Sequence, residues 1–265
     1  MNRIQQLFEN KSSGILSVFY TGGFPQLNST IEIAKALQAA GVDLIEIGIP
    51  FSDPVADGPA IQESNKTALQ NGMNLKLLLR QVKEIRKEVS IPIILMGYMN
   101  PVLQYGVERF CFDCTSAGVD GLILPDLPLE VYQAEYRAIF EHAGLANTFL
   151  VSPTTSEERI RFIDELSHSF IYAVSASSTT GAKSDFSDDQ IKYFERIKSM
   201  NLTSPFLIGF GISNHSTFQT ACRFGSGAII GSAFVTMLKN STDIGDDVES
   251  FIKALDRSSD KASEN

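Results

Sequence analysis

Two carboxylates stand at the end of one apolar segment of this sequence. Glu46 interrupts the apolar run 42–49, and Asp57 lies in the proline-rich loop that follows it. An ionised carboxylate is costly in an apolar interior unless it is paired or used in chemistry. Asp57 can fold back over the end of the same strand, so both acids can face one pocket. This pattern favours proton transfer. The alternative is a structural glutamate satisfied by a backbone amide or an arginine.

Two glycine-rich turns later in the chain could bind an anion. The segment 209–213 contains Gly211, and Gly231 with Ser232 opens a short helix. Glycine lets a ligand approach the backbone closely, and the first N–H groups of a helix are free to bind phosphate. A long loop of small residues over 175–184 could add Gly181. We therefore predict a phosphate site, with plain tight turns as the alternative.

The elements that must position these residues alternate between strand and helix. Apolar strands are expected at 15–20, 42–49, 91–97, 121–124, 147–151, 170–174, 205–209 and 227–230. Helices are expected at 29–41, 59–70, 75–89, 107–116, 130–142, 156–166, 188–200, 215–224 and 248–255, with Asn28 or Ser29 and Ser156 as caps. Asn100-Pro101 is expected to break the chain.

Eight strands, each followed by a helix, favour a (β/α)8 TIM barrel, and an open doubly wound sheet is the alternative. The prediction is one barrel domain over residues 1–256 with a short N-terminal helix, followed by a polar tail at 257–265. The motif Ala-Gly-Val-Asp occurs at 40–43 and again at 117–120, which suggests a repeated unit. In a barrel the active site lies at the carboxyl ends of the strands. Glu46, Asp57 and Tyr172 would then share one face with the 175–184 loop.

Composition narrows the class of partner and the compartment. The formal net charge of −9 over 265 residues disfavours nucleic acid or an anionic membrane as the main partner. No signal-peptide pattern and no run of about 18 apolar residues occurs, which predicts a cytoplasmic protein.

No metal site is predicted from the cysteines and histidines. Cys111 and Cys114 have the spacing of half a zinc site, but no second pair exists, so a packing role is expected. The three histidines fall in helix ends or loops away from strand ends, which disfavours imidazole chemistry; they are His142, His168 and His215.

With these residues in place, the chain closely resembles the tryptophan synthase alpha subunit family. The resemblance covers about residues 1–255 and is most specific at 46–62, Glu-Ile-Gly-Ile-Pro-Phe-Ser-Asp-Pro-Val-Ala-Asp-Gly-Pro-Ala-Ile-Gln. It implies a barrel that cleaves indole-3-glycerol phosphate to indole and D-glyceraldehyde 3-phosphate without a metal or organic cofactor.

The same resemblance implies roles for individual residues. Glu46 would be the general acid and base, Asp57 would hold the indole N–H, and Tyr172 would be the active-site tyrosine. The implied pocket residues are Phe19, Phe210 and Thr180, and the implied phosphate ligands are Gly181, Gly211, Gly231 and Ser232.

One segment departs from the family pattern. The family often has Arg-X-Gly-Val-Thr-Gly after the sixth strand, whereas Ala176 and Ser178 stand here at the arginine and first glycine. We expect the 175–184 loop to act as a lid that orders over bound ligand. Without the arginine, closure should depend more on Thr180 meeting the acidic loop near Asp57.

The resemblance also implies a partner, a beta subunit that uses pyridoxal phosphate, in an alpha2beta2 heterotetramer. The segments 50–54, 100–101 and 126–128 match partner-facing loops of the family. Two other functions stay open from the residues alone: an interaction subunit with a retained barrel, and another phosphosugar barrel enzyme such as an isomerase. Aldolase mechanisms based on a lysine Schiff base or a histidine-bound metal are disfavoured, because no lysine or histidine falls within a predicted strand.

Overall fold

Eight parallel strands close into a barrel in the computed structural model, which describes residues 2–55, 57–175 and 185–255. Each strand pairs with its neighbours in chain order, and β1 pairs with β8. The strands are β1 Ile15–Thr21, β2 Leu44–Gly48, β3 Ile93–Met96, β4 Gly121–Ile123, β5 Ala146–Val151, β6 Ile171–Val174, β7 Phe206–Gly209 and β8 Gly227–Ile230. The TIM barrel prediction is confirmed, and the open sheet is excluded.

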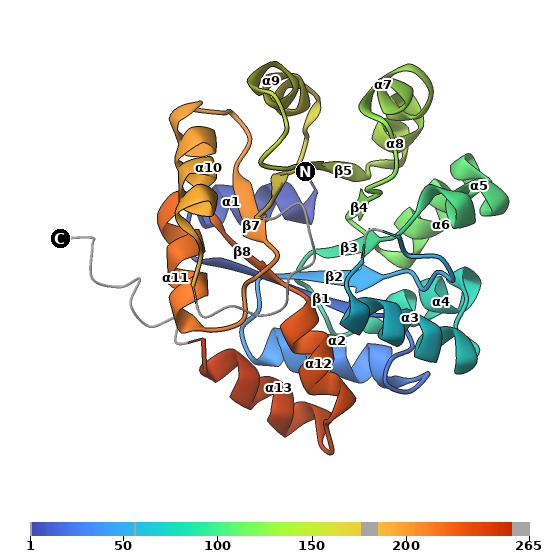
Figure 1. Cartoon of the computed structure of the whole chain (residues 1–265). Helices are drawn as coiled ribbons and strands as arrows, with labels where there is room; N and C mark the ends of the chain where they lie inside the picture. Colours follow the sequence, from blue (N-terminus) through green and yellow to red (C-terminus); the bar gives the residue numbers. More distant parts are fainter. Residues whose placement is uncertain (1, 56, 176–184, 256–265) are drawn as a thin grey trace.

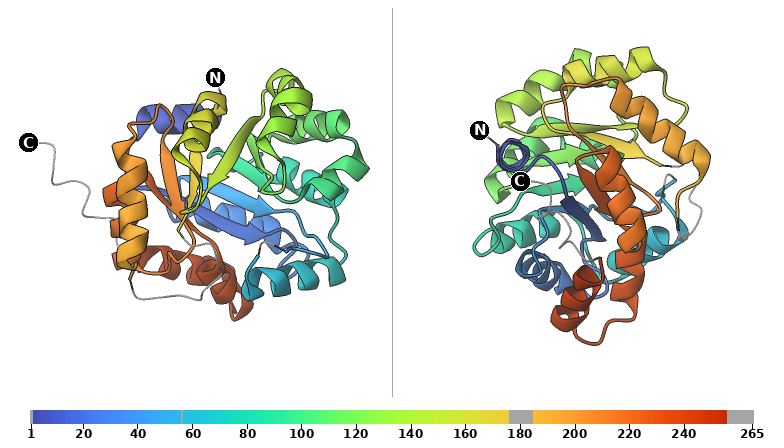
Figure 2. Two further views of the ribbon diagram at one scale, coloured as in Figure 1. Left: turned by 45° about the horizontal axis from the view of Figure 1, so that its top comes forward. Right: turned by 90° about the vertical axis from the view of Figure 1, so that its left-hand side faces the viewer.

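The helices form an outer layer around the strands, as Figures 1 and 2 show. They are α1 Arg3–Asn10, α2 Ser29–Ala39, α3 Pro59–Gln70, α4 Leu75–Ile85, α5 Met99–Tyr105, α6 Val107–Ala117, α7 Leu129–Val131, α8 Arg137–Ala143, α9 Glu157–Leu166, α10 Asp188–Ser199, α11 His215–Phe224, α12 Ser232–Lys239 and α13 Ile244–Lys253, with the π-helix η1 Tyr132–Tyr136 between α7 and α8. None of the helices in the described ranges has the length and apolar character needed to cross a membrane.

Several local predictions differ from the structure. Asn100-Pro101 does not break the chain but lies in the first turn of α5, where a proline costs little because its missing N–H has no helical partner. The helix expected over 130–142 is interrupted by η1. The last helix begins four residues early, at Ile244, because Asp243 caps it. Ser156 caps α9 as predicted, but the Asn28 side chain makes no cap bond.

The repeated Ala-Gly-Val-Asp motif has a structural counterpart at the amino end of the barrel. Asp43 accepts a hydrogen bond from the N–H of Leu16 at 2.8 Å, and Asp120 accepts one from the N–H of Ile93 at 2.9 Å. Each aspartate precedes one strand and holds the beginning of the strand before it. A basic residue neutralises each carboxylate, Lys11 beside Asp43 and Arg86 beside Asp120. Each aspartate therefore helps to fix how far its own strand is shifted along the strand before it.

The N-terminal helix α1 closes the amino end of the barrel. Ile4 is fully buried against the barrel interior, and the ring of Phe8 packs 5.6 Å from that of Phe170. Asn2 caps α1 and donates to the carbonyl of Asp120 at 2.6 Å. Apolar side chains fill the axis above it: Ile15, Leu44, Ile94, Ile123, Ala146, Phe170, Leu207 and Ile229. The amino end is thus sealed, and the polar interior residues lie toward the carboxyl end.

Candidate active site

Glu46 lies inside the barrel on β2. Strand alternation places it inward between Leu44, which belongs to the axial cluster, and Gly48. Its side chain is fully buried, and burial raises the pKa of Glu46 to about 7, against a smaller opposite effect of a hydrogen bond from Ser17. A carboxyl group whose pKa lies near neutral pH is suited to both give and take a proton.

Asp57 lies in the loop after β2, which folds back on itself. The N–H of Asp57 bonds to the carbonyl of Pro54 at 3.1 Å, and Gln62 at the start of α3 donates to the carbonyl of Asp57 at 2.9 Å. The carboxylate is half-buried and accepts a bond from the Tyr98 hydroxyl at 3.2 Å. Burial raises the pKa of Asp57 to about 6, although the Tyr98 bond opposes this shift.

Tyr172 on β6 is buried on the inner face of the barrel. Burial raises the pKa of Tyr172 well above 10, and the charges of Glu46 and Asp57 raise it further. Gly209 on the neighbouring strand makes room for this ring, because a Cβ at that position would lie 2.5 Å from the Tyr172 hydroxyl. Glu46 and Tyr172 both lie on the inner face of the barrel, and the charges of Glu46 and Asp57 both affect the Tyr172 phenol.

Two phenylalanines line the same end of the barrel. Phe19 on β1 is the register partner of Glu46, and its ring packs against the backbone of Gly48. Phe210 follows β7, and its ring meets that of Tyr172 edge to face with centroids 6.2 Å apart. Ser175 fixes the turn by donating a short hydrogen bond to the carbonyl of Phe210. These rings give the carboxylates the flat apolar walls that an aromatic substrate needs.

The two glycine-rich turns lie side by side because β7 pairs with β8. Gly211, two residues after the end of β7, adopts a left-handed φ of 81°. Gly231 and Ser232 open α12, whose first turn has no side-chain cap. A Cβ at Gly231 would lie 3.7 Å from Phe19, so this helix start borders the aromatic wall. Uncapped N–H groups at a helix start are suited to bind a phosphate oxygen.

Several predictions concern residues whose structure is not described, among them the polar tail at 257–265. Thr180 and Gly181, together with the departures at Ala176 and Ser178, fall outside the described residues. The lid function of this loop therefore stays a prediction.

In the described ranges, no group of three or more histidine, cysteine or carboxylate side chains is placed so that it could hold a metal ion. Cys111 and Cys114 are buried on α6, and burial raises the pKa of the Cys111 thiol to about 12. His215 contacts the backbone carbonyl of Leu255, and His168 contacts the Glu141 carboxylate. Both histidines lie on the outer layer.

Sequence reasoning missed two residues that touch the carboxylates. Ser17 bonds to Glu46, and Tyr98 bonds to Asp57. Each had a signal in the sequence: Ser17 is a polar residue in an apolar strand at the inward spacing of Phe19, and Tyr98 follows the third strand directly. Neither bond could be assigned without the barrel, since the Ser17–Glu46 partners come from two strands and the Tyr98–Asp57 partners from the loops that follow two strands.

Comparison with known proteins agrees with this geometry. A family model described as tryptophan synthase alpha chain matches residues 5–263. A tryptophan synthase alpha chain of Parabacteroides distasonis is 54% identical over 255 residues, covering 96% of this chain and 99% of the relative. One of Flavobacterium johnsoniae is 56% identical over 242 residues, covering 91% and 95%.

Solved structures give the same answer. A tryptophan synthase structure from Mycobacterium tuberculosis superposes with a TM-score of 0.87 at 31% identity, covering 96% of both chains. A mutant alpha subunit from Pyrococcus furiosus superposes with a TM-score of 0.85 at 32% identity, covering 92% of this chain and 98% of the other. The barrel, its acidic strand and loop, and these similarities over nearly the whole length place the chain in the tryptophan synthase alpha chain family.

Proposed function

We propose that Glu46, Asp57 and Tyr172 carry out the retro-aldol cleavage of indole-3-glycerol phosphate to indole and D-glyceraldehyde 3-phosphate, the reaction of the family to which the chain belongs. The observation that carries this assignment is the placement of two carboxyl groups: Glu46 is fully buried inside the barrel on β2, and the loop that follows β2 holds Asp57 against the Tyr98 hydroxyl at 3.2 Å. Burial raises the pKa of both groups, to about 7 for Glu46 and about 6 for Asp57.

Glu46 begins the reaction as an acid. Its carboxyl proton goes to the indole ring carbon that carries the glycerol phosphate chain, and the ring becomes a cationic indolenine. The resulting carboxylate then takes the proton of the adjacent hydroxyl. As that O–H pair forms the aldehyde carbonyl, the carbon–carbon bond breaks and its electrons restore the aromatic ring. Glu46 ends protonated, so one group serves both steps.

Asp57 stabilises the intermediate. A carboxylate that accepts the indole N–H gains interaction energy as positive charge develops on the ring, so it acts mainly near the transition state. Tyr172 and the rings of Phe19 and Phe210 hold the indole between them. The low dielectric of this pocket strengthens the Asp57 contribution.

The phosphate is held at the adjacent corner. The backbone of Gly211 and Gly231 and the hydroxyl of Ser232 donate to it, with Gly181 from the loop. Thr180 and this loop shut the pocket over the substrate and keep water from the carboxylates. Proton transfer and bond cleavage need only these groups, so the chain works without a cofactor of its own.

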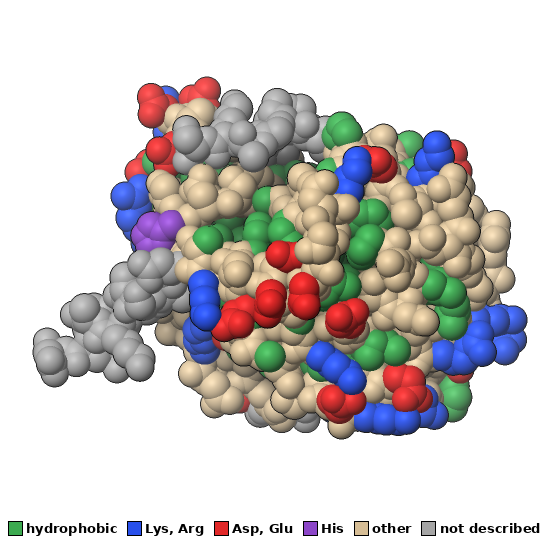
Figure 3. Space-filling model, turned by 90° about the horizontal axis from the view of Figure 1, so that it is seen from below, with side chains coloured by type: hydrophobic (Ala, Val, Ile, Leu, Met, Phe, Trp, Pro, Cys, Tyr) green, Lys and Arg blue, Asp and Glu red, His purple; other side chains and the backbone are tan. Residues whose placement is uncertain are grey.

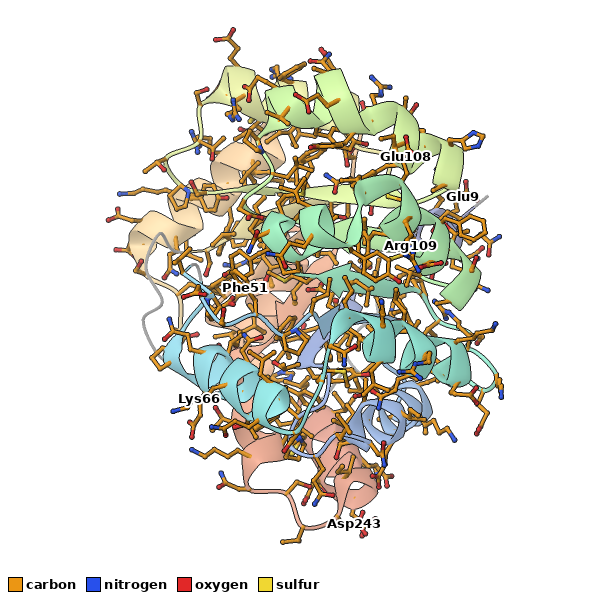
Figure 4. All side chains as sticks on the ribbon, turned by 90° about the vertical axis from the view of Figure 1, so that its right-hand side faces the viewer. Glu9, Phe51, Lys66, Glu108, Arg109 and Asp243 are labelled. Carbon is orange, nitrogen blue, oxygen red and sulfur yellow. The ribbon has the colours of Figure 1, made fainter. Side chains whose placement is uncertain are left out.

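The partner is a beta subunit in an alpha2beta2 heterotetramer, with pyridoxal phosphate in the beta subunit only. Exposed apolar side chains on the segments that follow β2 and β3 support this surface: Val55 in the β2–α3 loop is 88% exposed, and Leu103 on α5 is 52% exposed. Figure 4 shows Phe51 at the β2–α3 loop on this side of the molecule, with Lys66 on α3. The ring of Phe51 lies 5.3 Å from that of Tyr98, so a partner on this loop would press on the residue that holds Asp57.

The face in Figure 3 has acidic side chains near its middle, with lysine and arginine around them. A nucleic acid needs a continuous basic surface, which the described residues of this face do not form. The distribution of charge therefore favours a small substrate that backbone donors hold. The expected site of action is the cytoplasm.

The test is indole release from indole-3-glycerol phosphate by wild type and Glu46→Gln, each with and without a beta subunit. Glutamine keeps the size of the side chain but cannot transfer the proton, so turnover should fall by at least about 1,000-fold with KM little changed. The matched control is Glu63→Gln, which removes a surface carboxylate paired with Lys239 at 2.8 Å and should keep full activity. Turnover of Glu46→Gln within a few-fold of wild type would refute the assignment.

A further inference from the structure

Ser17 and Glu46 form a hydrogen bond inside the barrel. The Ser17 hydroxyl donates to Oε1 of Glu46 at 2.6 Å, and both side chains have 0% exposure. Ser17 lies on β1 two residues before Phe19, the register partner of Glu46. Alternation along β1 turns Ile15, Ser17 and Phe19 to the same inner face. The serine therefore contacts Glu46 from the side that faces the amino end of the barrel.

This bond makes the two oxygens of Glu46 unequal. Oε1 has the Ser17 hydroxyl, whereas Oε2 is buried without a hydrogen-bond partner among the residues that the structure describes. An unpaired buried carboxylate oxygen is unfavourable, and proteins retain such atoms mainly where a ligand completes the site. Oε2 is the atom that remains for the substrate.

We propose that Ser17 is a positioning residue that holds Oε1 of Glu46 as a hydrogen-bond acceptor throughout the reaction, so that Oε2 alone carries the proton to and from the substrate. This inference rests on the acid–base role proposed above for Glu46.

The chemistry of a hydroxyl fits this task. In the carboxylate form Oε1 accepts from Ser17, and in the acid form Oε1 is the carbonyl oxygen and still accepts the same bond. The proton leaves Oε2 for the ring carbon, and the hydroxyl proton of the substrate arrives at Oε2, while the Ser17 bond stays in place. Without it, the terminal torsion of the glutamate is broad, and both oxygens can compete for the proton.

Among the described residues, Tyr172 on β6 is a titratable group that the charge of Glu46 affects. Asp57, from the loop after β2, acts on the same phenol. The neighbouring inward position on β3 is Ile94, which is apolar. Removing the Ser17 hydroxyl therefore removes the neutral donor that the described part of the chain gives to Oε1 and leaves the nearby charges as they are.

The experiment compares Ser17→Ala and Ser17→Thr with wild type. Loss of the donor destabilises the carboxylate more than the acid, so the pKa of Glu46 should rise by about one pH unit in Ser17→Ala. The alkaline limb of kcat/KM should move upward by the same amount. At pH 7 kcat should fall about 10-fold with KM within about two-fold of wild type, because the ring and phosphate contacts are kept. Ser17→Thr keeps the hydroxyl and should restore most of the loss.

The control is Tyr20→Phe. Tyr20 is buried on the same strand, faces outward, and donates to the carbonyl of Thr30 at 2.8 Å. The Tyr20→Phe variant loses a buried hydrogen bond that lies outside the active site, so its pH profile should match that of wild type. Carbon-13 labelling of glutamate carboxyl groups, with the Glu46 signal assigned by its loss in Glu46→Gln, gives the pKa of Glu46 independently of turnover.

The possible outcomes separate the two proposals. If Glu46→Gln is inactive but the Ser17→Ala pKa, pH profile and kcat match wild type, the role of Ser17 is refuted and that of Glu46 stands. If Ser17→Ala and Tyr20→Phe lose activity equally with unchanged pH profiles, Ser17 is only structural. If Glu46→Gln remains active, both proposals fail.

Discussion

Tyr98 and Asp57 are joined by a 3.2 Å hydrogen bond from the phenol to Oδ2, although 41 residues separate them in the chain. The backbone beside Tyr98 is fixed in turn, because the N–H of Met99 donates to both carboxylate oxygens of Asp126 at 2.9 and 3.0 Å. The loop after β4 thus sets the position of the loop after β3, which carries the donor for Asp57.

Tyr98→Phe should impair the reaction most at low pH. The lost bond favours the ionised form of Asp57, so its pKa should rise from about 6. Since Asp57 must be charged to stabilise the indolenine, the acidic limb of kcat/KM should move upward, with a loss of about five-fold at pH 6 and a smaller loss at pH 8.

The matched control is Tyr105→Phe. Tyr105 donates to Oδ2 of Asp113 at 2.6 Å on the outer layer, away from the barrel interior. Its pH profile should equal that of wild type. An acidic limb in Tyr98→Phe that coincides with that of Tyr105→Phe would show that the phenol does not influence Asp57.

Glu46→Gln should be more stable than wild type at neutral and alkaline pH. Burial raises the folded-state pKa of Glu46 to about 7 from the ordinary 4.5. Between these values the folded state binds more protons than the unfolded state, so the free energy of unfolding decreases as pH rises through this window. The destabilisation is complete above about pH 7 and absent below about pH 4.5, and it amounts to about 3 kcal/mol at most. Urea unfolding of both proteins at pH 5 and pH 8 measures it, and an equal difference at the two values would contradict the prediction.

Ser232→Asp should raise KM by about 100-fold or more with a smaller effect on kcat. The new carboxylate would stand at the uncapped start of α12, where we place the phosphate, and its negative charge would repel the negative charge of the phosphate. Ser199→Asp on the exposed end of α10 adds the same charge elsewhere and should leave KM unchanged. Unaltered saturation by the substrate in Ser232→Asp would move the phosphate to another part of the barrel.

Thr180→Val tests the lid, which lies outside the described residues. If the Thr180 hydroxyl meets the acidic loop near Asp57 in the closed state, its loss should lower kcat about 10-fold and weaken activation by a beta subunit. Indole release with and without that subunit, and protease cleavage of the loop with and without ligand, are the measurements. Equal activity and equally fast cleavage of the loop in the presence of ligand would argue against a catalytic lid.

The sequence predicted most of the architecture because barrel strands are buried on both faces. Their apolar runs stand out from the amphipathic helices. The bounds predicted for the strand at 227–230 and for the helix at 215–224 agree with the structure to the residue. Glu46 was conspicuous for the same reason, as a charge within an apolar run. The helix α5 was missed because Asn100-Pro101 is a strong break signal, and only the structure shows the proline within a first turn.

Contacts between strands were beyond reach from the sequence alone. The Ser17 bond to Glu46 depends on the register of β1 and β2, and the Tyr98 bond to Asp57 depends on how the loop folds back. A shift of one residue in register would turn Ser17 or Glu46 away from the interior. Hydrophobic periodicity shows which face of each strand is buried, but it does not show the register between neighbouring strands.

The pairing of β1 with β8 has a consequence for synthesis on the ribosome. Ile15 pairs with Gly227, where a Cβ would lie 1.9 Å from the Ile15 carbonyl oxygen, so the two backbones meet too closely for any side chain there. The ribosome synthesises β8, which pairs with β1, more than 200 residues after β1 itself. At ordinary translation rates this is a delay on the order of 10 s or more. Throughout that time a nascent chain exposes an apolar, unpaired strand edge, the form most prone to mispairing with other chains. A ribosome that stalls before residue 227 therefore leaves a chain that cannot close, and chaperone binding to such a stalled chain should end once β8 has emerged.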